Sequence, residues 1–176
     1  MYSYGHELLA TGRYVPFGML VIYMALACTF GMCLWIEDVR EHRLRRIYTR
    51  PWAAAGWVLL PIIAHLAGET SRAFGTLAGS VSLWCAYALL RWLSAGSLGR
   101  GDVTLAAALG APLGFIGASG NSFTGFLYPL LIATLITFVL GGLASLWVLA
   151  RGRSAKTRIP FGPFMIAGAA LTLIAL

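Results

Sequence analysis

The sequence predicts an all-α, polytopic membrane protein with about six transmembrane helices, and three observations lead to this fold class. The 176 residues are 59% hydrophobic and 11% charged, whereas soluble domains are about half apolar and about a quarter charged. The mean hydropathy is +0.80. The apolar residues form several runs of roughly the 20 residues that cross a bilayer, each bounded by charge, glycine or proline. We therefore expect a single helical membrane domain over residues 1–176.

The first three spans are expected at residues 15–36, 52–67 and 73–93. The first apolar stretch continues past Cys28 to Ile36, which is longer than the roughly 7 to 15 residues of a signal core. We therefore interpret it as a membrane span and not as a cleaved export signal. The second span is short, and the third follows a short connector that contains Arg72.

The last three spans are expected at residues 103–118, 126–149 and 159–176. Within the fourth span, Ala106, Gly110 and Gly114 form a stripe of small residues at four-residue spacing. Such a stripe allows the backbones of two helices to approach closely. We therefore expect the fourth span to make a close contact with another helix.

The basic residues predict the orientation of these spans. Of the 13 basic residues, 11 lie in the first, third and fifth connectors, and the remaining two, Arg13 and Arg72, lie on the opposite side. Connectors rich in Arg and Lys stay in the cytoplasm, so both termini are expected outside. Because the basic residues flank apolar runs and do not form one face of a helix, the lipid bilayer is the expected partner and nucleic acid is not.

The three cysteines do not indicate a metal site or a disulfide framework. Cys28, Cys33 and Cys85 all lie within apolar runs and form no CxxC pair. We interpret them as small core residues. No metal or other cofactor is expected.

Asp38 and Asp102 are the candidate catalytic residues, and they are the only aspartates in the sequence. Asp38 follows the first span where it leaves the membrane inward, and Asp102 precedes the fourth span where it enters from the same side. The topology thus places both at one membrane depth, where they could meet if the two spans pack together. Two close carboxylates share one proton near neutral pH, so one serves as a base and the other as an acid. Activation of water against an amide requires this pair of roles.

Each aspartate also has a purely structural interpretation. Asp38 could be a solvated charge among the other charged residues of the first connector, and Asp102 could cap the fourth helix. The run Gly99-Arg-Gly-Asp102 favours a functional site, because its glycines let another backbone approach the carboxylate closely. We therefore expect Gly99 and Gly101 to shape the site.

Three segments resemble the prepilin peptidase family, also called type IV leader peptidases, which are aspartic proteases of the GxGD group. The first runs from Asp38 to Leu44 and is followed by Pro51, thirteen residues after the aspartate. The second is residues 99–114, and the third is Ile-Pro-Phe-Gly-Pro-Phe at residues 159–164. Their order, spacing and topology agree with the family from about residue 17 onward.

The resemblance implies an enzyme of the inner membrane that removes the basic leader of a prepilin or pseudopilin substrate at the cytoplasmic face. Asp38 and Asp102 are then the catalytic pair, and the reaction requires neither a metal nor a covalent intermediate. The site is expected to be framed from the sixth span by Pro160, Phe161 and Gly162. The prolines of this segment also fit a structural role, because proline is tolerated at the start of a helix.

The chain departs from the family pattern at three positions, which leaves local geometry and substrate contacts open. Arg45 and Arg46 stand where the family usually has Pro-Asn, and Thr104 stands where a lysine often follows the second aspartate. The cysteine-bearing cytoplasmic insert of long family members is absent. The resemblance therefore implies a short form without N-methyltransferase activity or an S-adenosylmethionine site.

The residues alone leave two other functions open. Ionisable groups at membrane depth often mark ion paths, and broken helices often line them. A small transporter or channel is therefore one alternative. A homologue that binds prepilins without cleaving them is the other.

Overall fold

The computed structural model describes residues 1–41, 44–95, 98–118, 125–151 and 160–176. Over these residues the chain is all-α, as predicted, with seven helices and no strand. The helices are α1 Tyr2–Ala10, α2 Tyr14–Glu41, α3 Arg46–Leu66, α4 Thr70–Leu93, α5 Arg100–Gly117, α6 Leu127–Ala150 and α7 Gly162–Ala175. Helices α2 to α7 coincide with the six expected spans. Ile159, the expected start of the sixth span, lies outside the described residues. Four basic connector residues also lie outside them, namely Arg43, Arg153, Lys156 and Arg158.

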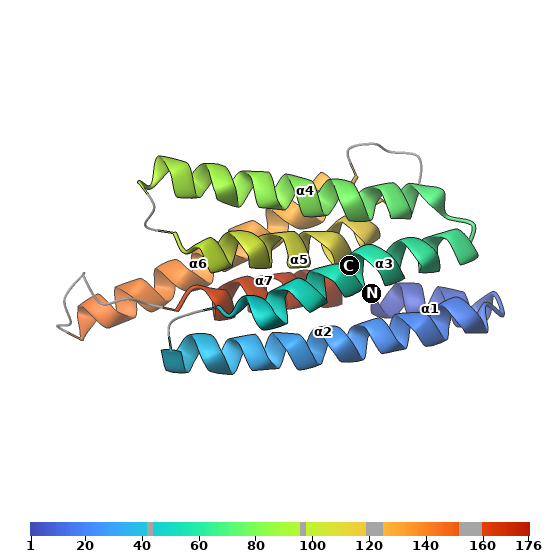
Figure 1. Ribbon diagram of the computed structural model, residues 1–176, viewed down its shortest axis with the longest axis horizontal. Coiled ribbons are helices and arrows are strands. Elements are labelled where there is room, and N and C mark those ends of the chain that lie inside the picture. Colours follow the sequence, from blue (N-terminus) through green and yellow to red (C-terminus); the bar gives the residue numbers. More distant parts are fainter. Residues whose placement is uncertain (42–43, 96–97, 119–124, 152–159) are drawn as a thin grey trace.

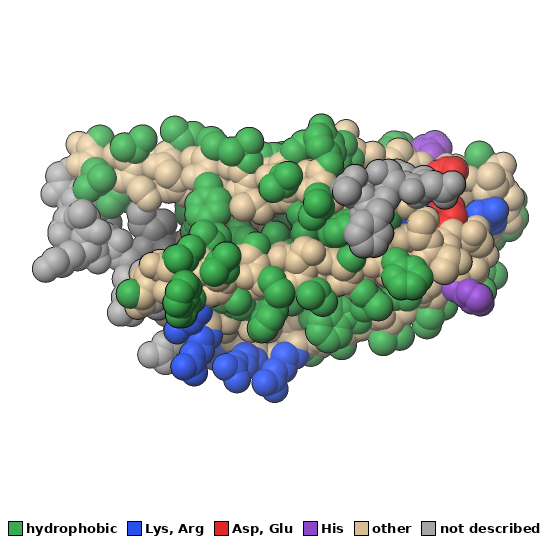
Figure 2. Space-filling model, turned by 90° about the horizontal axis from the view of Figure 1, so that it is seen from above, with side chains coloured by type: hydrophobic (Ala, Val, Ile, Leu, Met, Phe, Trp, Pro, Cys, Tyr) green, Lys and Arg blue, Asp and Glu red, His purple; other side chains and the backbone are tan. Residues whose placement is uncertain are grey.

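Three helices, α2, α4 and α6, are each long and apolar enough to cross a membrane. Helix α7 is apolar but shorter, with 14 residues. Large hydrophobic side chains are exposed along the length of the molecule, which is typical of a surface that meets lipid (Figure 2). The helical membrane fold is thus confirmed, whereas membrane crossing by α3, α5 and α7 stays a prediction.

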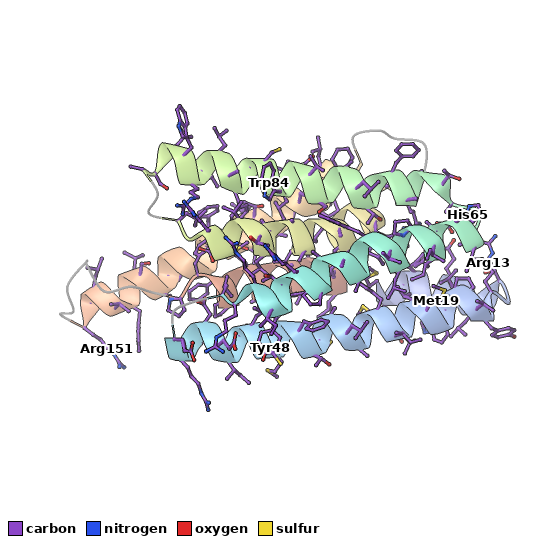
Figure 3. The ribbon with its side chains drawn as sticks, in the orientation of Figure 1. Arg13, Met19, Tyr48, His65, Trp84 and Arg151 are labelled. Carbon is purple, nitrogen blue, oxygen red and sulfur yellow. The ribbon has the colours of Figure 1, made fainter. Side chains whose placement is uncertain are left out.

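Successive helices run back and forth along the long axis, so their ends gather at the two ends of the bundle (Figure 1). The C-terminal end of α2 and the N-terminal ends of α5 and α7 lie at the same end. Arg151 also lies toward this end, whereas Arg13 and His65 lie at the other (Figure 3). The chain thereby brings three segments that are distant in sequence to one end of the bundle.

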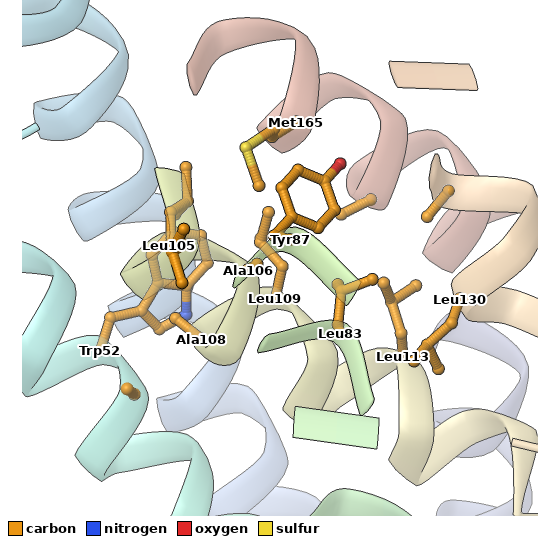
Figure 4. Close-up of a cluster of buried hydrophobic side chains, with 14 of the residues drawn as sticks. Trp52, Leu83, Tyr87, Leu105, Ala106, Ala108, Leu109, Leu113, Leu130 and Met165 are labelled. Atoms are coloured by element: carbon orange, nitrogen blue, oxygen red, sulfur yellow. The ribbon is translucent and has the colours of Figure 1, made fainter. Parts of the chain in front are cut away.

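Helix α5 is the central helix of the bundle. It contacts α3, α4, α6 and α7, and 13 of its 18 residues are buried. Leu105 and Leu109 of α5 pack in a hydrophobic cluster with Trp52 of α3, Tyr87 of α4 and Met165 of α7 (Figure 4). Burial of these apolar side chains fixes the position of α5 among its neighbours.

Glycines bring α4 and α5 into backbone contact. A Cβ atom added at Gly110 would lie against the carbonyl oxygen of Gly79, and one added at Gly114 would lie against that of Gly75. The predicted close helix contact of the fourth span is therefore confirmed, and α4 is its partner. Because the obstructing atoms belong to the backbone, a larger residue would separate the helices. The contact holds the C-terminal half of α5 against the first turns of α4.

A polar network lies at the opposite end of the bundle. Arg72 of α4 is only 8% exposed and forms an ion pair with Glu69. Its guanidinium lies 4.3 Å from the ring centroid of Tyr4 and donates to the carbonyl oxygen of Phe115 at 3.3 Å. A buried guanidinium requires such partners because its desolvation is costly. Arg72 therefore ties α1 and α5 to α4.

The interpretation of the cysteines as core residues is wrong. Cys28 and Cys85 are exposed, Cys33 is half-buried, and all three are free thiols. In a membrane protein an apolar side chain is as compatible with lipid as with the core. Position within an apolar run therefore does not separate the two environments.

Candidate active site

Asp38 lies near the C-terminal end of α2 and is almost fully buried, with 5% of its surface exposed. Its Oδ2 atom accepts a hydrogen bond of 2.9 Å from the backbone N–H of Gly162, the first residue of α7. The first N–H groups of a helix have no partner within the helix, and the helix dipole favours negative charge there. The N-terminus of α7 therefore holds and stabilises the Asp38 carboxylate.

Asp102 lies in the first turn of α5, directly before the expected span 103–118. Its Oδ2 atom accepts a hydrogen bond of 3.1 Å from the backbone N–H of Gly99, which precedes the helix. Burial and the nearby charge of Asp38 raise the pKa of Asp102 to about 6. The Gly99 hydrogen bond and the charge of Arg91 act in the opposite direction. Asp102 therefore caps its helix and is also electrostatically coupled to Asp38.

The glycine that binds each carboxylate has no room for a side chain. A Cβ atom at Gly162 would lie 2.8 Å from Oδ2 of Asp38, and one at Gly99 would lie 2.9 Å from Oδ2 of Asp102. Both distances are shorter than normal contacts between a Cβ atom and an oxygen. Each glycine therefore lets a carboxylate reach the backbone N–H at the start of a helix.

Leu44, in the connector between α2 and α3, packs against both of these helix starts. A Cβ atom at Gly101 would lie 2.7 Å from the Leu44 Cβ, and one at Gly162 would lie 3.1 Å from its Cδ2. Gly101 thus accommodates Leu44 and not an aspartate. Leu44 was not predicted to be a site residue. An apolar residue within an otherwise Arg-rich connector is the signal that could have identified it.

Leu44 and the start of α7 connect the segments that carry Asp38 and Asp102, whereas α2 and α5 make little direct contact. Helix α2 packs mainly against α3, and then against α7 and α1, whereas α5 packs mainly against α4 and α3. The site is therefore not built by packing of the first span against the fourth, as the sequence had suggested it could be. The start of α7 and Leu44 lie between the segments that carry Asp38 and Asp102.

Comparisons with known proteins find relatives that share one name. The chain is 42% identical over 154 residues to the prepilin leader peptidase/N-methyltransferase of Xanthomonas campestris pv. campestris, which covers 86% of this chain and 48% of that protein. It is 32% identical over 174 residues to the protein of the same name in Burkholderia pseudomallei strain 1026b, which covers 94% of this chain and 50% of that protein. The chain is thus similar over most of its own length to prepilin leader peptidases. It spans about half the length of the curated relatives it matches.

Neither a protein-family model nor a solved structure matches the chain. The resemblance read from the three sequence segments is nevertheless confirmed by these relatives. The roles of individual residues in this prepilin peptidase homologue are supported by its geometry and stay a proposal.

An aromatic wall extends from Phe161 of the expected Pro160-Phe161-Gly162 segment. The Phe161 ring lies 6.4 Å from the ring of Tyr87 and 5.7 Å from that of Phe138, measured between centroids. Pro160 directly precedes this ring and is half-buried. The Tyr87 hydroxyl interacts with Thr137 and with the charge of Asp102. Phe161 therefore links the start of α7 to α4 and α6 beside the aspartates.

Arg91 of α4 is a site residue that the sequence did not predict. It was considered only as one of the basic residues that predict membrane orientation. Its guanidinium donates to the carbonyl oxygen of Leu98, the residue before Gly99. Its positive charge also favours the ionised form of Asp102 and lowers the pKa of that group. Tyr87 and Arg91 are four residues apart, so they share one face of α4. That spacing is the signal that could have identified both.

The three departures from the family pattern make local contacts. Arg45 forms an ion pair of 2.9 Å with Glu41, so it folds back onto α2. Arg46 is exposed at the start of α3. The Thr104 hydroxyl donates to a backbone carbonyl one turn earlier in α5, at 3.1 Å. Arg45 and Thr104 thus bond within their own segments, and Arg46 faces outward.

Metal-ligating residues do not cluster in the part of the chain that the structure describes. Within those residues, no group of three or more His, Cys, Asp or Glu side chains is arranged to hold a metal ion.

Proposed function

We propose that this chain is a membrane-embedded aspartic endopeptidase that removes the basic leader of prepilin-like proteins. The observation that carries the proposal is the pair of carboxylates at one end of the bundle, each bound by a glycine N–H at a helix N-terminus. The charge of Asp38 acts on Asp102, as expected of a pair that shares a proton. Homology to proteins named prepilin leader peptidases supports the same activity.

The raised pKa of Asp102 assigns it the role of acid. In the proposed reaction the ionised Asp38 takes a proton from a water molecule, and the resulting oxygen attacks the carbonyl carbon of the scissile peptide. Protonated Asp102 donates to the carbonyl oxygen as the tetrahedral intermediate forms. As the intermediate collapses and the C–N bond breaks, Asp38 gives the proton it took from water to the leaving amine, and Asp102 takes its proton back from the hydroxyl that becomes the new carbonyl. The N–H of Gly162 stabilises the charged form of Asp38 from which the reaction starts.

The proposed substrate is a prepilin or pseudopilin, with a basic leader followed by an apolar helix. We propose that both termini of the enzyme lie outside the cell membrane and that the aspartates lie at its cytoplasmic face. The excess of basic residues in the first, third and fifth connectors supports this orientation. A substrate cut where its leader meets its apolar helix would then present its scissile bond at the depth of the aspartates.

We propose that the two aspartates of this chain supply the peptidase activity. The curated relatives carry a second activity, N-methyltransferase, in their printed names. No feature of the described residues favours the transporter alternative.

The direct test is proteolysis by the purified protein. The chain in detergent is incubated with a candidate prepilin, and mass spectrometry identifies both fragments. Cleavage between the basic leader and the apolar helix is expected, and EDTA is expected to leave the rate unchanged. An intact substrate after prolonged incubation with correctly folded protein would overturn the proposal. Loss of activity with EDTA that zinc restores would overturn the aspartic mechanism.

A further inference from the structure

An apolar groove opens on the surface formed by α3, α4 and α5. Its volume is about 370 Å³, within the range of roughly 300 to 1,000 Å³ typical of small-molecule sites. The groove exists because small side chains lie between two large aromatic ones. It is lined by Ala53, Ala54, Ala107, Trp57, Trp84, Ser80, Val81, Arg50 and Thr104. Trp57 and Trp84 are 47% and 48% exposed, so the groove faces the surroundings of the protein.

The polar groups in the middle of the groove are hydrogen-bonded to one another and need no polar ligand. The indole N–H of Trp57 donates to the Ser80 hydroxyl at 2.8 Å, and that hydroxyl donates to the carbonyl oxygen of Ala107 at 2.7 Å. These polar groups satisfy one another. The rest of the middle of the groove is alanine, valine and tryptophan, so it suits a hydrocarbon chain.

One end of the groove is cationic. Arg50 lies in the early turns of α3, two residues before the expected span 52–67, and it is exposed. Thr104 lies near the start of α5 at the same end of the bundle. Trp57 follows Arg50 by seven residues, so it lies about 10 Å further along α3. The groove therefore combines a basic end at the membrane surface with an apolar length that extends into the bilayer.

This groove is separate from the candidate active site. Thr104 and Asp102 are two residues apart in α5, which places them about 200° apart around the helix axis. Asp102 accepts a hydrogen bond from Gly99 and senses the charges of Asp38 and Arg91, and none of these three residues lines the groove. A peptide lying in the groove would therefore not reach Asp102, which argues against the substrate as its occupant.

We propose that the groove binds one anionic phospholipid, with its phosphate on Arg50 and an acyl chain between Trp57 and Trp84. Basic pockets between membrane helices attract anionic headgroups, and tryptophan prefers the boundary between headgroups and acyl chains. The bound lipid belongs to the leaflet at the end of the bundle that carries Asp102. The inference depends on the membrane location of the protein and not on its proposed peptidase activity.

Native mass spectrometry of the detergent-purified protein tests this binding. We expect one phosphatidylglycerol to be retained, with clear preference over phosphatidylcholine. Arg50→Gln is expected to weaken phosphatidylglycerol binding about fivefold and to abolish the preference, because one basic contact is lost. Ala54→Leu, at an exposed position, fills the groove and is expected to weaken both lipids. Arg40→Gln is the matched control, since Arg40 is exposed at the same end but lies on α2 outside the groove.

Three results would overturn the proposal. Equal losses with Arg40→Gln and Arg50→Gln would indicate a general surface-charge effect. Competition by glycerol 3-phosphate as strong as that by the lipid would indicate an anion site without acyl recognition. Displacement of phosphatidylglycerol by a prepilin peptide would identify the groove as a substrate surface. Since lipid retention is measured without substrate turnover, an inactive protein would leave this test intact.

Discussion

The backbone N–H of Gly162 donates a 2.9 Å hydrogen bond to Oδ2 of Asp38, across 124 residues of sequence. Gly99 and Asp102 make the equivalent contact within a single helix start. One oxygen of each carboxylate is therefore fixed by a helix N-terminus. This arrangement leads to the following predictions.

Removal of either acidic group is expected to abolish proteolysis. Asp38→Asn and Asp102→Asn keep the size of the side chain but cannot exchange a proton, so each should reduce the cleavage rate by at least about a hundredfold. The double variant should be hardly slower than either single variant, because both groups act in one step. The measurement is the single-turnover appearance of the cleaved leader by mass spectrometry.

Glu41→Gln is the matched control for this pair. Glu41 lies one turn after Asp38 on α2 and is exposed, with Arg45 as its ion-pair partner. An exposed ion pair contributes little to stability. Its loss should leave the cleavage rate close to that of the wild type. A stable Asp38→Asn or Asp102→Asn protein that cleaves at a near-native rate would contradict the proposed mechanism.

Gly162→Ala is expected to displace the Asp38 carboxylate. The new methyl group would lie 2.8 Å from Oδ2 of Asp38 and 3.1 Å from Cδ2 of Leu44, so the hydrogen bond to α7 must lengthen or break. We expect a loss of about tenfold or more in cleavage rate, which is less than the roughly 10² to 10⁴ of a whole acid–base group because the carboxylate is displaced and not removed. Gly142→Ala is the control, because nothing lies within 4 Å of the added atom. Equal activity of the two variants would show that the Gly162 contact has no role.

The cleavage rate is expected to fall as pH rises through the upper pKa of the aspartate pair. Burial and Asp38 raise the pKa of Asp102 to about 6, and the protonated acid is the active form, so activity is lost on the alkaline side. Arg91→Gln removes a charge that lowers this pKa, so the alkaline limb should move to higher pH. Arg46→Gln removes an exposed charge from α3 and should leave the limb in place. A shift to lower pH in Arg91→Gln would contradict the assigned role of Asp102.

Gly110→Ala is expected to destabilise the bundle. The added methyl group would meet the carbonyl oxygen of Gly79 and lie 2.8 Å from the Cα of Ser80, so the backbones of α4 and α5 must separate. Overpacking of this kind costs about 1 to 3 kcal/mol. Thermal unfolding in detergent should show a lower Tm than in Gly18→Ala, where no atom lies within 4 Å. Indistinguishable Tm values would show that the contact tolerates a methyl group.

Topology reporters test the proposed orientation. A reporter fused after Leu176 should behave as exported, and one inserted near Lys156 should behave as cytoplasmic, because 11 of 13 basic residues lie in alternate connectors. Reversed signals would place the aspartates at the opposite face and would separate them from the leader of a prepilin.

Hydropathy was sufficient to predict the six long helices, because each buries its backbone hydrogen bonds internally and needs only an apolar run. It did not predict α1, whose nine residues are too few to span a bilayer. The aspartates were identifiable because they are the only two and because the topology places them at one end. The bond from Gly162 to Asp38 was not, since it depends on how α7 docks against α2.

The roles of Leu44, Tyr87 and Arg91 at the site were not predicted, for the same reason. Each side chain acts on a segment that is distant in sequence or lies across a connector, and hydropathy patterns carry no information about such contacts. The glycine pattern did predict a contact between helices, because the absence of a side chain directly allows two backbones to approach. It indicated the close α4–α5 contact through Gly110 and Gly114 before a partner helix was known.

The dependence of Asp38 on Gly162 also sets an order of events during biosynthesis. Asp38 and Asp102 leave the ribosome well before Gly162, which follows Asp102 by 60 residues. Until the last helix is made and docked, Asp38 lacks the backbone N–H that holds its carboxylate in the folded protein. A nascent chain that stalls before residue 162 would therefore carry both aspartates without the complete arrangement around them.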